Sequence, residues 1–305
     1  MHLTEPFQPT GDRPLDIAVI GSGIAGMGSA WLLGQRHRVT LFEKNDYFGG
    51  HTHTHLVDDG RGSGVAVDSG FIVCNRPNYP HLFGLFGTLG IETQATEMSF
   101  GMSMDAGRLE YSGDNLDTLF AQRGNLLRPG FLRMVGEILR FNRLGKAALA
   151  QGEFADQRLG DFLAHHRFSP RLADDYLLPM AAAIWSCPTG TMREFPARSF
   201  LQFFDNHGLM NINDRPQWET VVGGSRRYID RMLSEQRFEA VTSQPINRVE
   251  RHEHGVYLPD VDRRFDAVVM AGHADQTLAS LDRPDSTETS ILGAFRFQEN
   301  RAFLH

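Results

Sequence analysis

Short apolar runs alternate with small and polar residues at the start of the chain. Residues 16–20, with the sequence DIAVI, are typical of a strand that is buried on both faces. Small residues follow, and Trp31-Leu32-Leu33 then gives an apolar helical face that ends near Gly34. A second apolar run, VTLF at residues 39–42, is followed at once by Glu43. The pattern predicts a strand, a glycine-rich turn, a helix, a strand and an acidic residue within about 30 residues.

The turn between the first strand and the helix carries Gly21, Gly23 and Gly26 in a Gly-x-Gly-x-x-Gly spacing. Gly21 permits a tight turn, Gly23 lets a pyrophosphate approach the backbone, and Gly26 lets the helix lie close to the sheet. Backbone amides at the start of the helix would then face the anion. Glu43, 22 positions after Gly21, would accept hydrogen bonds from an adenosine ribose, and its charge would repel a 2′-phosphate. We therefore expect a dinucleotide site that does not favour NADP.

A second pair of glycines distinguishes FAD from NAD. Gly49-Gly50-His51 begins six residues beyond Glu43, where a flexible turn could return under a cofactor longer than NAD. The combination of the first glycine motif, Ala30, Glu43 and this glycine pair resembles the flavin-containing amine oxidase and phytoene-desaturase superfamily. The resemblance implies that the glycine pair and His51 lie along the phosphates and ribityl chain of a non-covalently bound FAD.

The resemblance continues through most of the chain. It implies that residues 67–71, VDSGF, pass the flavin ring, and that Gly223-Gly224, followed by a helix over residues 226–237, form a further glycine turn. It also implies strands at residues 245–249, 255–258 and 265–271 that cover the adenine and return to the FAD domain. Residues 181–186, 206–209 and 215–218 resemble a bacterial subgroup of amine-oxidase-like proteins that has no settled substrate.

These motifs give one set of expected cofactor-binding residues, and the catalytic residues stay unassigned. The expected FAD contacts are Gly21, Ser22, Gly23, Ile24, Ala25, Gly26, Glu43, Lys44, Gly49, Gly50, His51, Asp68, Gly70, Phe71, Gly223, Gly224, Ile246 and Ala271.

The expected fold class is α/β, with a discontinuous Rossmann-like FAD-binding domain and an inserted α+β substrate domain rich in helices. The resemblance implies a FAD domain at residues 14–85 and 220–284 and a substrate domain at 86–219 and 285–305. Residues 293–297, GAFRF, look like a strand of the substrate domain. Relatives carry a further C-terminal stretch, so the resemblance also implies that this chain is truncated and that its activity as it stands is uncertain.

Helical patterns dominate the expected insert. A helix is predicted from Pro129 to Ala150. Its apolar face contains Phe131, Leu132, Val135 and Leu139. Its other face carries Arg133, Arg140, Arg143 and Lys146, which indicates a solvated surface or, as the alternative, contact with an acidic membrane. Ser169-Pro170 predicts the start of another helix that runs toward Trp185.

Composition narrows the class of protein. The chain has 305 residues, a formal charge of −7 and no basic run, so a nucleic-acid partner is not expected. Only two cysteines occur, far apart, which argues against a disulfide framework and fits a cytoplasmic protein. No apolar segment reaches the length of a membrane span, although peripheral membrane contact stays open. The 22 phenylalanines indicate extensive internal apolar surface.

Histidine, tryptophan and cysteine residues that could form functional sites also have simpler structural interpretations. His51, His53 and His55 would share one face of a strand, but a role beside the flavin is favoured over a metal site, and no metal is predicted. Trp185 and Trp218 are either core residues or walls of the substrate cavity. Cys187 is more consistent with a small buried hydrophobe than with a covalent flavin anchor.

The leading hypothesis is an FAD-dependent oxidoreductase that removes hydride from an amine or from an apolar, lipid-like or polyene-like substrate. O₂ or another acceptor would reoxidise the flavin, and the cofactor would perform the chemistry while the protein positions it. Two alternatives stay open: a non-catalytic flavin-fold protein and an NAD-linked dehydrogenase.

Overall fold

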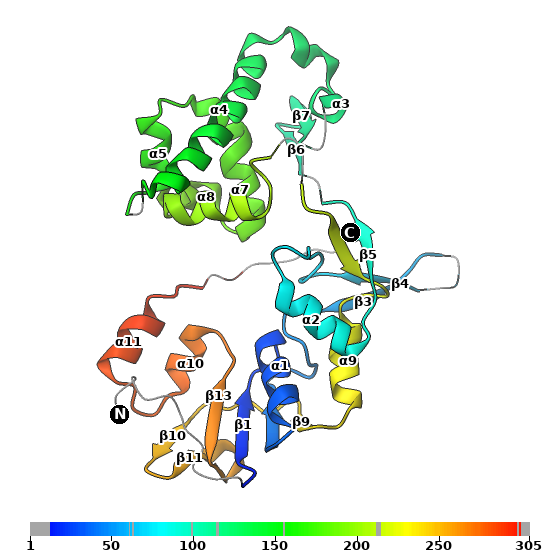
Figure 1. Cartoon of the computed structure of the whole chain (residues 1–305), viewed down its shortest axis with the longest axis vertical. Coiled ribbons are helices and arrows are strands. Elements are labelled where there is room, and N and C mark those ends of the chain that lie inside the picture. The colour runs from blue at the N-terminus through cyan, green and yellow to red at the C-terminus, as the bar shows by residue number, and fades with distance from the viewer. Residues whose placement is uncertain are drawn as a thin grey trace. The chain divides into compact units, whose positions relative to one another are not determined.

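The computed structural model describes residues 13–297 and 299, except 61, 63, 99, 114, 115, 155 and 212–214. The chain forms two compact units (Figure 1). Unit 1 contains residues up to 72, 84–94 and from 220 onward, and unit 2 contains residues 73–83 and 95–219. Unit 2 is therefore inserted into unit 1.

Unit 1 is built on a four-stranded parallel sheet in the order β13-β1-β2-β9. Strand β1 (Asp16–Ile20) has a buried centre, and β13, from a distant part of the sequence, lies beside it (Figure 1). The other elements of unit 1 are α1 (Ile24–Leu33), β2 (Arg38–Phe42), β3 (Thr54–Asp58), β4 (Gly64–Asp68), α9 (Arg226–Ser234), β9 (Glu239–Val241), β10 (Glu250–His252), β11 (Gly255–Leu258), η4 (Pro259–Val261), β12 (Arg263–Phe265), β13 (Ala267–Met270), α10 (Ala274–Ser280) and α11 (Ser286–Gly293).

The predicted order of strand, turn, helix and strand at the start of unit 1 is confirmed. Helix α1 ends at Leu33 with Gly34 as its C-terminal cap, and β2 pairs with β1 in parallel. A helix between two parallel strands is the βαβ arrangement in which both sheet faces can be covered. Strands β10, β11 and β12 form a separate antiparallel sheet, and β3 pairs with β4 in a hairpin.

Three elements cross between the units, and the remaining elements belong to unit 2. The crossing elements are α2 (Pro80–Leu89), β5 (Thr93–Thr96) and β8 (Trp218–Val221). The elements of unit 2 are β6 (Gly101–Met104), β7 (Leu109–Ser112), α3 (Leu116–Leu119), η1 (Arg123–Leu127), α4 (Pro129–Gln151), α5 (Leu159–His165), α6 (Pro170–Leu172), η2 (Ala173–Leu177), α7 (Leu178–Trp185), η3 (Thr189–Glu194) and α8 (Ala197–Asn206).

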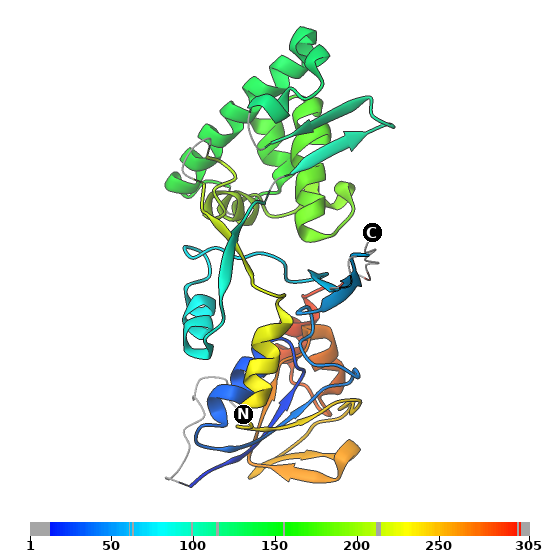
Figure 2. The same cartoon turned by 90° about the vertical axis from the view of Figure 1, so that its right-hand side faces the viewer.

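Phenylalanine packing forms the core of unit 2. The ring of Phe141, which is fully buried in α4, has ring centroids of four other phenylalanines within 6.4 Å, all in edge-to-face or tilted contact. Helices α4, α5, α7 and α8 enclose this core, while the β6–β7 hairpin projects beside them (Figures 1 and 2). The expectation of an apolar interior rich in phenylalanine is confirmed within this unit.

Both long helices predicted in the insert are present. Helix α4 begins with Pro129 at its first turn and ends at Gln151, where Gly152 has φ +68°. Ser169 caps the second helix by accepting a hydrogen bond from the Leu172 backbone amide. This second helix continues through α6 and α7 to Trp185 but contains a π-helical turn, η2, which the sequence pattern did not indicate.

Several local predictions are wrong. Residues 293–297 do not form a strand, because α11 continues to Gly293 and an irregular segment follows. Leu132 and Leu139 were expected on the buried face of α4, but they are 44% and 49% exposed. Helix α9 ends at Ser234, before the expected residue 237.

The observed units also differ from the expected domain ranges. Residues 286–293 form α11, which packs on α10 in unit 1, whereas 285–305 was expected in the substrate domain. Residues 73–83 belong to unit 2, although they were expected in the FAD domain. Residues 298 and 300–305 lie outside the described residues.

Candidate cofactor site

The first glycine turn has two tight positions and one open position. A Cβ atom on Gly21, which has φ +99°, would lie 2.9 Å from the Ala271 carbonyl oxygen. A Cβ atom on Gly26 would lie only 1.8 Å from the Gly21 carbonyl oxygen. On Gly23 it would meet no atom within 4 Å, so the space in front of Gly23 is open. Gly21 and Gly26 thus permit the close packing of the turn, whereas Gly23 borders free volume.

The N-terminus of α1 faces the same loop. Gly23 is its N-cap residue, the first turn contains no acidic side chain, and Ile24 and Ala25 are exposed. The first backbone N–H groups of a helix lack acceptors within the helix and carry a partial positive charge. This end of α1 is therefore suited to a phosphate group.

Glu43 lies at the end of β2 and joins this turn to the next loop. Its Oε2 atom accepts hydrogen bonds from the Ser22 backbone amide at 3.0 Å and from Ser22 Oγ at 2.5 Å. Its Oε1 atom accepts one from the Asn45 backbone amide at 2.9 Å. The residue is only 5% exposed. Because a carboxylate offers about four acceptor positions, these three bonds leave capacity for one further donor.

The second glycine loop lies directly against the first. Gly49 and Gly50 both have positive φ, at +123° and +58°. The Gly49 amide donates to Ser22 O and Ser22 Oγ, both at 3.1 Å, and a Cβ atom on Gly50 would lie 3.0 Å from Gly23 Cα. The structure therefore brings the two glycine motifs together, although Gly26 and Gly49 are 23 positions apart in the sequence.

The segment after β4 returns to the second loop. The Phe71 amide donates to the His51 carbonyl oxygen at 2.9 Å, and a Cβ atom on Gly70 would lie 2.1 Å from that oxygen. The Phe71 ring lies edge-on to the ring of Tyr228 with centroids 6.3 Å apart. Gly70, Phe71 and His51 therefore belong to the same cluster of loops as the glycine motifs.

Asp68 anchors the third glycine turn. Its carboxylate accepts hydrogen bonds from the Ser225 amide at 2.9 Å, from Ser225 Oγ at 2.7 Å and from Thr54 Oγ1 at 2.5 Å. Gly223 and Gly224 have φ values of +78° and +93°, and a Cβ atom on Gly224 would lie 2.4 Å from Thr54 Cγ2. Within the chain, the Asp68 carboxylate fixes the turn before α9 through its hydrogen bonds with Ser225. A contact of Asp68 with the cofactor stays a prediction.

The remaining expected contacts lie at the edges of this cluster. Ala271 follows β13, and its amide donates to the Ile20 carbonyl oxygen at 2.8 Å, which places it beside Gly21. Ile246 packs against the apolar cluster beneath the sheet, and Lys44 is exposed. The structure thus places all of these residues within unit 1.

Histidines and aromatic residues form two stacks near the loops. The rings of Tyr47 and His53 are stacked with centroids 4.6 Å apart, and the His53 and His55 rings are 4.2 Å apart. Burial, together with the nearby charges of His55 and Arg226, lowers the pKa of His53. Only His55 of the three expected histidines lies within β3, and His51 is instead 6.0 Å from the ring of His273. In the part of the chain that the structure describes, no cluster of three metal-binding side chains is found.

Sequence reasoning missed two groups of this site. The first is Asn45, whose backbone amide donates a hydrogen bond to Glu43. The second is the pair of Ser225 and Thr54, whose hydroxyl groups donate hydrogen bonds to the Asp68 carboxylate. A serine at the start of a helix, directly after a glycine pair, is the signal that could have identified Ser225. Thr54 carries no comparable signal because its role depends on contacts between distant segments.

Trp185 and Trp218 lie in unit 2, where both contact aromatic residues. The Trp185 ring contacts Phe195, Phe200 and Phe203, with centroids between 4.6 and 5.7 Å apart. Trp218 is 9% exposed, and its ring is stacked with His207 at 5.9 Å. The interpretation of both residues as core residues agrees with this packing, and a role beside a substrate stays a prediction.

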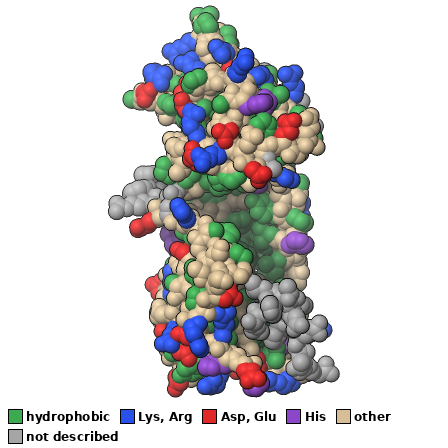
Figure 3. Space-filling view, turned by 90° about the vertical axis from the view of Figure 1, so that its left-hand side faces the viewer, with side chains coloured by type: hydrophobic (Ala, Val, Ile, Leu, Met, Phe, Trp, Pro, Cys, Tyr) green, Lys and Arg blue, Asp and Glu red, His purple; other side chains and the backbone are tan. Residues whose placement is uncertain are grey.

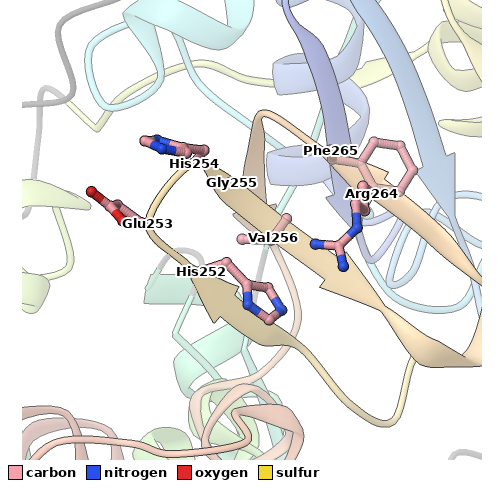
Figure 4. Close-up of a pocket in the computed structure, with 7 residues that line it drawn as sticks. All are labelled: His252, Glu253, His254, Gly255, Val256, Arg264 and Phe265. Carbon is pink, nitrogen blue, oxygen red and sulfur yellow. The ribbon is translucent and has the colours of Figure 1, made fainter.

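A cavity of about 400 Å³ lies at the turn between β10 and β11 (Figure 4). Arg264 and His252 point into the same region across the hairpin, whereas Glu253 and His254 lie at the turn. None of the residues that line this cavity belongs to the glycine loops. It is therefore separate from the candidate cofactor site.

A family comparison covers most of the chain. The family model described as flavin containing amine oxidoreductase matches residues 24–294. The chain belongs to this family. The family's description names a flavin-containing oxidoreductase, so the resemblance inferred from the sequence is confirmed at the level of the family.

Several solved structures share the fold of this chain. Cyclohexylamine oxidase from Brevibacterium oxydans is 20% identical with a TM-score of 0.67, and putrescine oxidase bound to putrescine is 20% identical with a TM-score of 0.65. A fatty acid isomerase from P. acnes is 17% identical with a TM-score of 0.55. Each match covers 92% of this chain but only 63% of the other chain, so this chain spans less than two thirds of their length. No curated protein sequence is similar enough to count as a match.

Proposed function

We propose that the three glycine turns of unit 1 bind FAD without a covalent link, as part of an oxidoreductase that takes hydride from an amine or from an apolar substrate. The observation that carries the proposal is the contact between the first two glycine loops beside an open space. Gly23 borders that space, the N-terminus of α1 faces it, and Gly50 lies against Gly23 Cα. A site for NAD alone has no need of the second loop.

The residues present fit the parts of FAD. The pyrophosphate would lie against Gly23 and the first amides of α1, where neither a Cβ atom nor an acidic side chain opposes it. Glu43 would accept a ribose hydroxyl through its remaining acceptor position. His51, Gly70 and Phe71, which are joined by a backbone hydrogen bond, would line the continuation of the cofactor.

FAD supplies the acceptor of a substrate hydride when it is bound, and it can pass the electrons on to O₂ or to another acceptor. The residues of this chain contribute binding and position. Asp68 fixes the turn at Gly223-Gly224, and Glu43 fixes the turn at Ser22, so that three loops from distant parts of the sequence are held together. Similarity to two amine oxidases and to a fatty acid isomerase supports a substrate class that includes amines and lipid-like molecules.

The test separates cofactor binding from turnover. The purified chain is titrated with FAD, NAD and NADP, and bound flavin is measured by its visible absorption and by quenching of its fluorescence. We expect FAD to bind with the highest affinity. Preference for NAD would replace the proposal with the dehydrogenase alternative, and failure to bind any of the three would overturn it.

Turnover is then measured on the FAD-loaded protein without oxygen. Bleaching of the flavin by a member of a panel of primary amines, polyamines and unsaturated fatty acids supports the oxidoreductase and identifies its substrate class. Tight FAD binding with no bleaching by any member of the panel would support the non-catalytic flavin-fold alternative instead.

A further inference from the structure

One surface of unit 2 exposes leucines among arginines. It is formed by η1 and the solvent-facing side of α4, and we call it the η1–α4 surface. Leu127 is 87% exposed, and Leu126, Leu132 and Leu139 are each between 44% and 49% exposed. The exposed basic side chains of the same segment are Arg123, Arg128, Arg133, Arg143 and Lys146.

The leucines on α4 are held outward by the packing of the opposite face. Phe131, Met134 and Phe141 are buried against the unit 2 core, which fixes the rotation of the helix. Leu132 and Leu139 are one and two positions away from these buried residues, and they therefore point toward solvent. The exposure of these leucines follows from the fold and not from disorder of the segment.

Leu126 and Leu127 lie at the tip of a braced turn. Arg128 Nη1 donates to Asn125 Oδ1 at 3.0 Å and to the Arg108 carbonyl oxygen at 3.3 Å. Asn125 is fully buried, and Pro129 begins α4 directly afterwards. The turn thus presents two neighbouring apolar side chains on a fixed backbone.

Positive charge is concentrated in this segment. Residues 120–146 contain six basic side chains and one acidic one, a formal charge of +5 within a chain of charge −7. The single acidic residue, Glu137, is 8% exposed and accepts hydrogen bonds from Ser169 and Arg133. Its charge is directed inward, so the outer surface of the segment is basic. At the edge of this surface, Asp117 of α3 pairs with Arg123. Figure 3 shows Lys and Arg side chains beside hydrophobic ones at the end of unit 2 that is drawn uppermost.

We propose that the η1–α4 surface docks on a bilayer that contains anionic lipids. Leu126 and Leu127 would enter the boundary between headgroups and acyl chains, as apolar residues of interfacial helices do. Arginines beside them can keep their guanidinium groups at the phosphate level while their stems lie along apolar surface. Anionic lipid headgroups are the partner that matches both the exposed leucines and the positive charge.

A second copy of the chain fits this surface less well. Charged residues are depleted from the centres of protein–protein interfaces, whereas arginines here separate one leucine from the next along α4. A two-fold dimer through the same surface would also place a segment of charge +5 against an identical segment. Self-association is therefore an outcome that the test must detect.

The test measures sedimentation of the purified chain with lipid vesicles. Vesicles of phosphatidylcholine alone are compared with vesicles that contain phosphatidylcholine and phosphatidylglycerol in equal amounts. We expect binding to the anionic vesicles only, and we expect it to weaken as NaCl is raised. Binding that is absent, or equal on both kinds of vesicle, would overturn the proposal.

Variants assign the binding to the surface. The double variant Leu126→Ser/Leu127→Ser should lower the partition coefficient at least about tenfold, because it removes the two side chains that enter the acyl boundary. Arg143→Gln should lower it about fivefold on anionic vesicles, and Arg123→Gln should lower it less, because the Arg123 guanidinium is paired with Asp117. Matched controls are Leu56→Ser and Arg283→Gln, since Leu56 is 80% exposed and the Arg283 side chain is 83% exposed in unit 1.

Two further outcomes would contradict the proposal. Equal losses in the controls and in the η1–α4 variants would show that no particular surface is used. A dimer in analytical ultracentrifugation that the Leu126→Ser/Leu127→Ser variant abolishes would assign the surface to self-association. Unchanged circular dichroism and melting temperature in each variant exclude unfolding as the cause of a loss.

Discussion

Two glycines of one motif, Gly23 and Gly26, have different physical roles. A Cβ atom on Gly26 would collide with the Gly21 carbonyl oxygen at 1.8 Å, so the absence of a side chain is a requirement of folding. Gly23 has φ −60° and ψ 176°, which any residue adopts, and its Cβ position is open. No described atom of the chain requires Gly23 to lack a side chain, which agrees with the proposed approach of a pyrophosphate to this position.

This difference gives a paired prediction. Gly23→Ala should leave the melting temperature close to that of the unmodified chain and raise the Kd for FAD at least tenfold, since the new methyl group occupies the space proposed for the pyrophosphate. Gly26→Ala should instead destabilise the fold by about 1–3 kcal/mol or more, because the backbone must shift to accept the Cβ atom. Thermal unfolding and FAD titration of both variants check the pair. Gly23→Ala protein that binds FAD as tightly as the unmodified chain would contradict the placement of the pyrophosphate.

The residue types that the sequence could predict are those whose roles are local. The spacing of Gly21, Gly23 and Gly26 predicted their turn because it encodes one short segment. The pairing of Asp68 with Ser225 joins positions 157 residues apart, and no local pattern indicates it. Periodicity placed Phe131 correctly in the interior but not Leu132, because the apolar stripe of α4 is wider than the face that the core covers.

At the scale of elements, the start of the helix at Pro170 was predictable and the structure of residues 293–297 was not. Ser169 before Pro170 encodes a cap and a first-turn proline, and the helix begins there. Residues 293–297 alternate aromatic and other residues, yet the capping box at Asp285 and Glu288 begins a helix that continues to Gly293. This capping box, which was not used as a signal in the sequence, explains why Gly293 lies in a helix, and residues 294–297 follow that helix without regular structure.

Ser169 joins α4 to α6, because it contacts Glu137 of α4 and caps α6. Ser169 Oγ donates to Glu137 and accepts from the Leu172 amide, so one hydroxyl both caps a helix and satisfies a buried carboxylate. Ser169→Ala should lower the free energy of unfolding by about 1–2 kcal/mol in urea denaturation. Ser234→Ala is the matched control, because that exposed hydroxyl only donates to the Arg231 carbonyl oxygen, and its loss should stay within about 0.5 kcal/mol. Equal losses in the two variants would contradict the role of the Glu137 contact.

At the scale of the whole molecule, the two units bury separate cores. The phenylalanine-rich cluster belongs to unit 2, and the cluster of Ala18, Phe42 and Val249 belongs to unit 1. The family resemblance implied two units, one inserted into the other. The positions at which the chain passes from one unit to the other could not be predicted. Residues 73–83 belong to unit 2 through contacts between distant residues, such as the pairing of Cys74 with Glu219, and no local pattern indicates these contacts. No helix in the described residues is long and apolar enough to span a membrane.

The positions of the three tryptophans allow the unfolding of each unit to be followed separately by fluorescence. Trp31 lies in unit 1, where its indole donates to Glu235 at 2.9 Å, while Trp185 and Trp218 lie in unit 2. Emission from the Trp31→Phe variant therefore reports on unit 2, and emission from the Trp185→Phe/Trp218→Phe variant reports on unit 1.

All the expected FAD contacts belong to unit 1, so FAD at about 100 times its Kd should stabilise that unit by about 2.7 kcal/mol. We expect FAD to raise the melting temperature that is measured by emission from the Trp185→Phe/Trp218→Phe variant and to leave that of the Trp31→Phe variant unchanged. Calorimetry of the unmodified chain should show two unfolding transitions. Equal shifts in both variants would mean that the units unfold as one cooperative body, because stabilisation of one core would then be transmitted in full to the other.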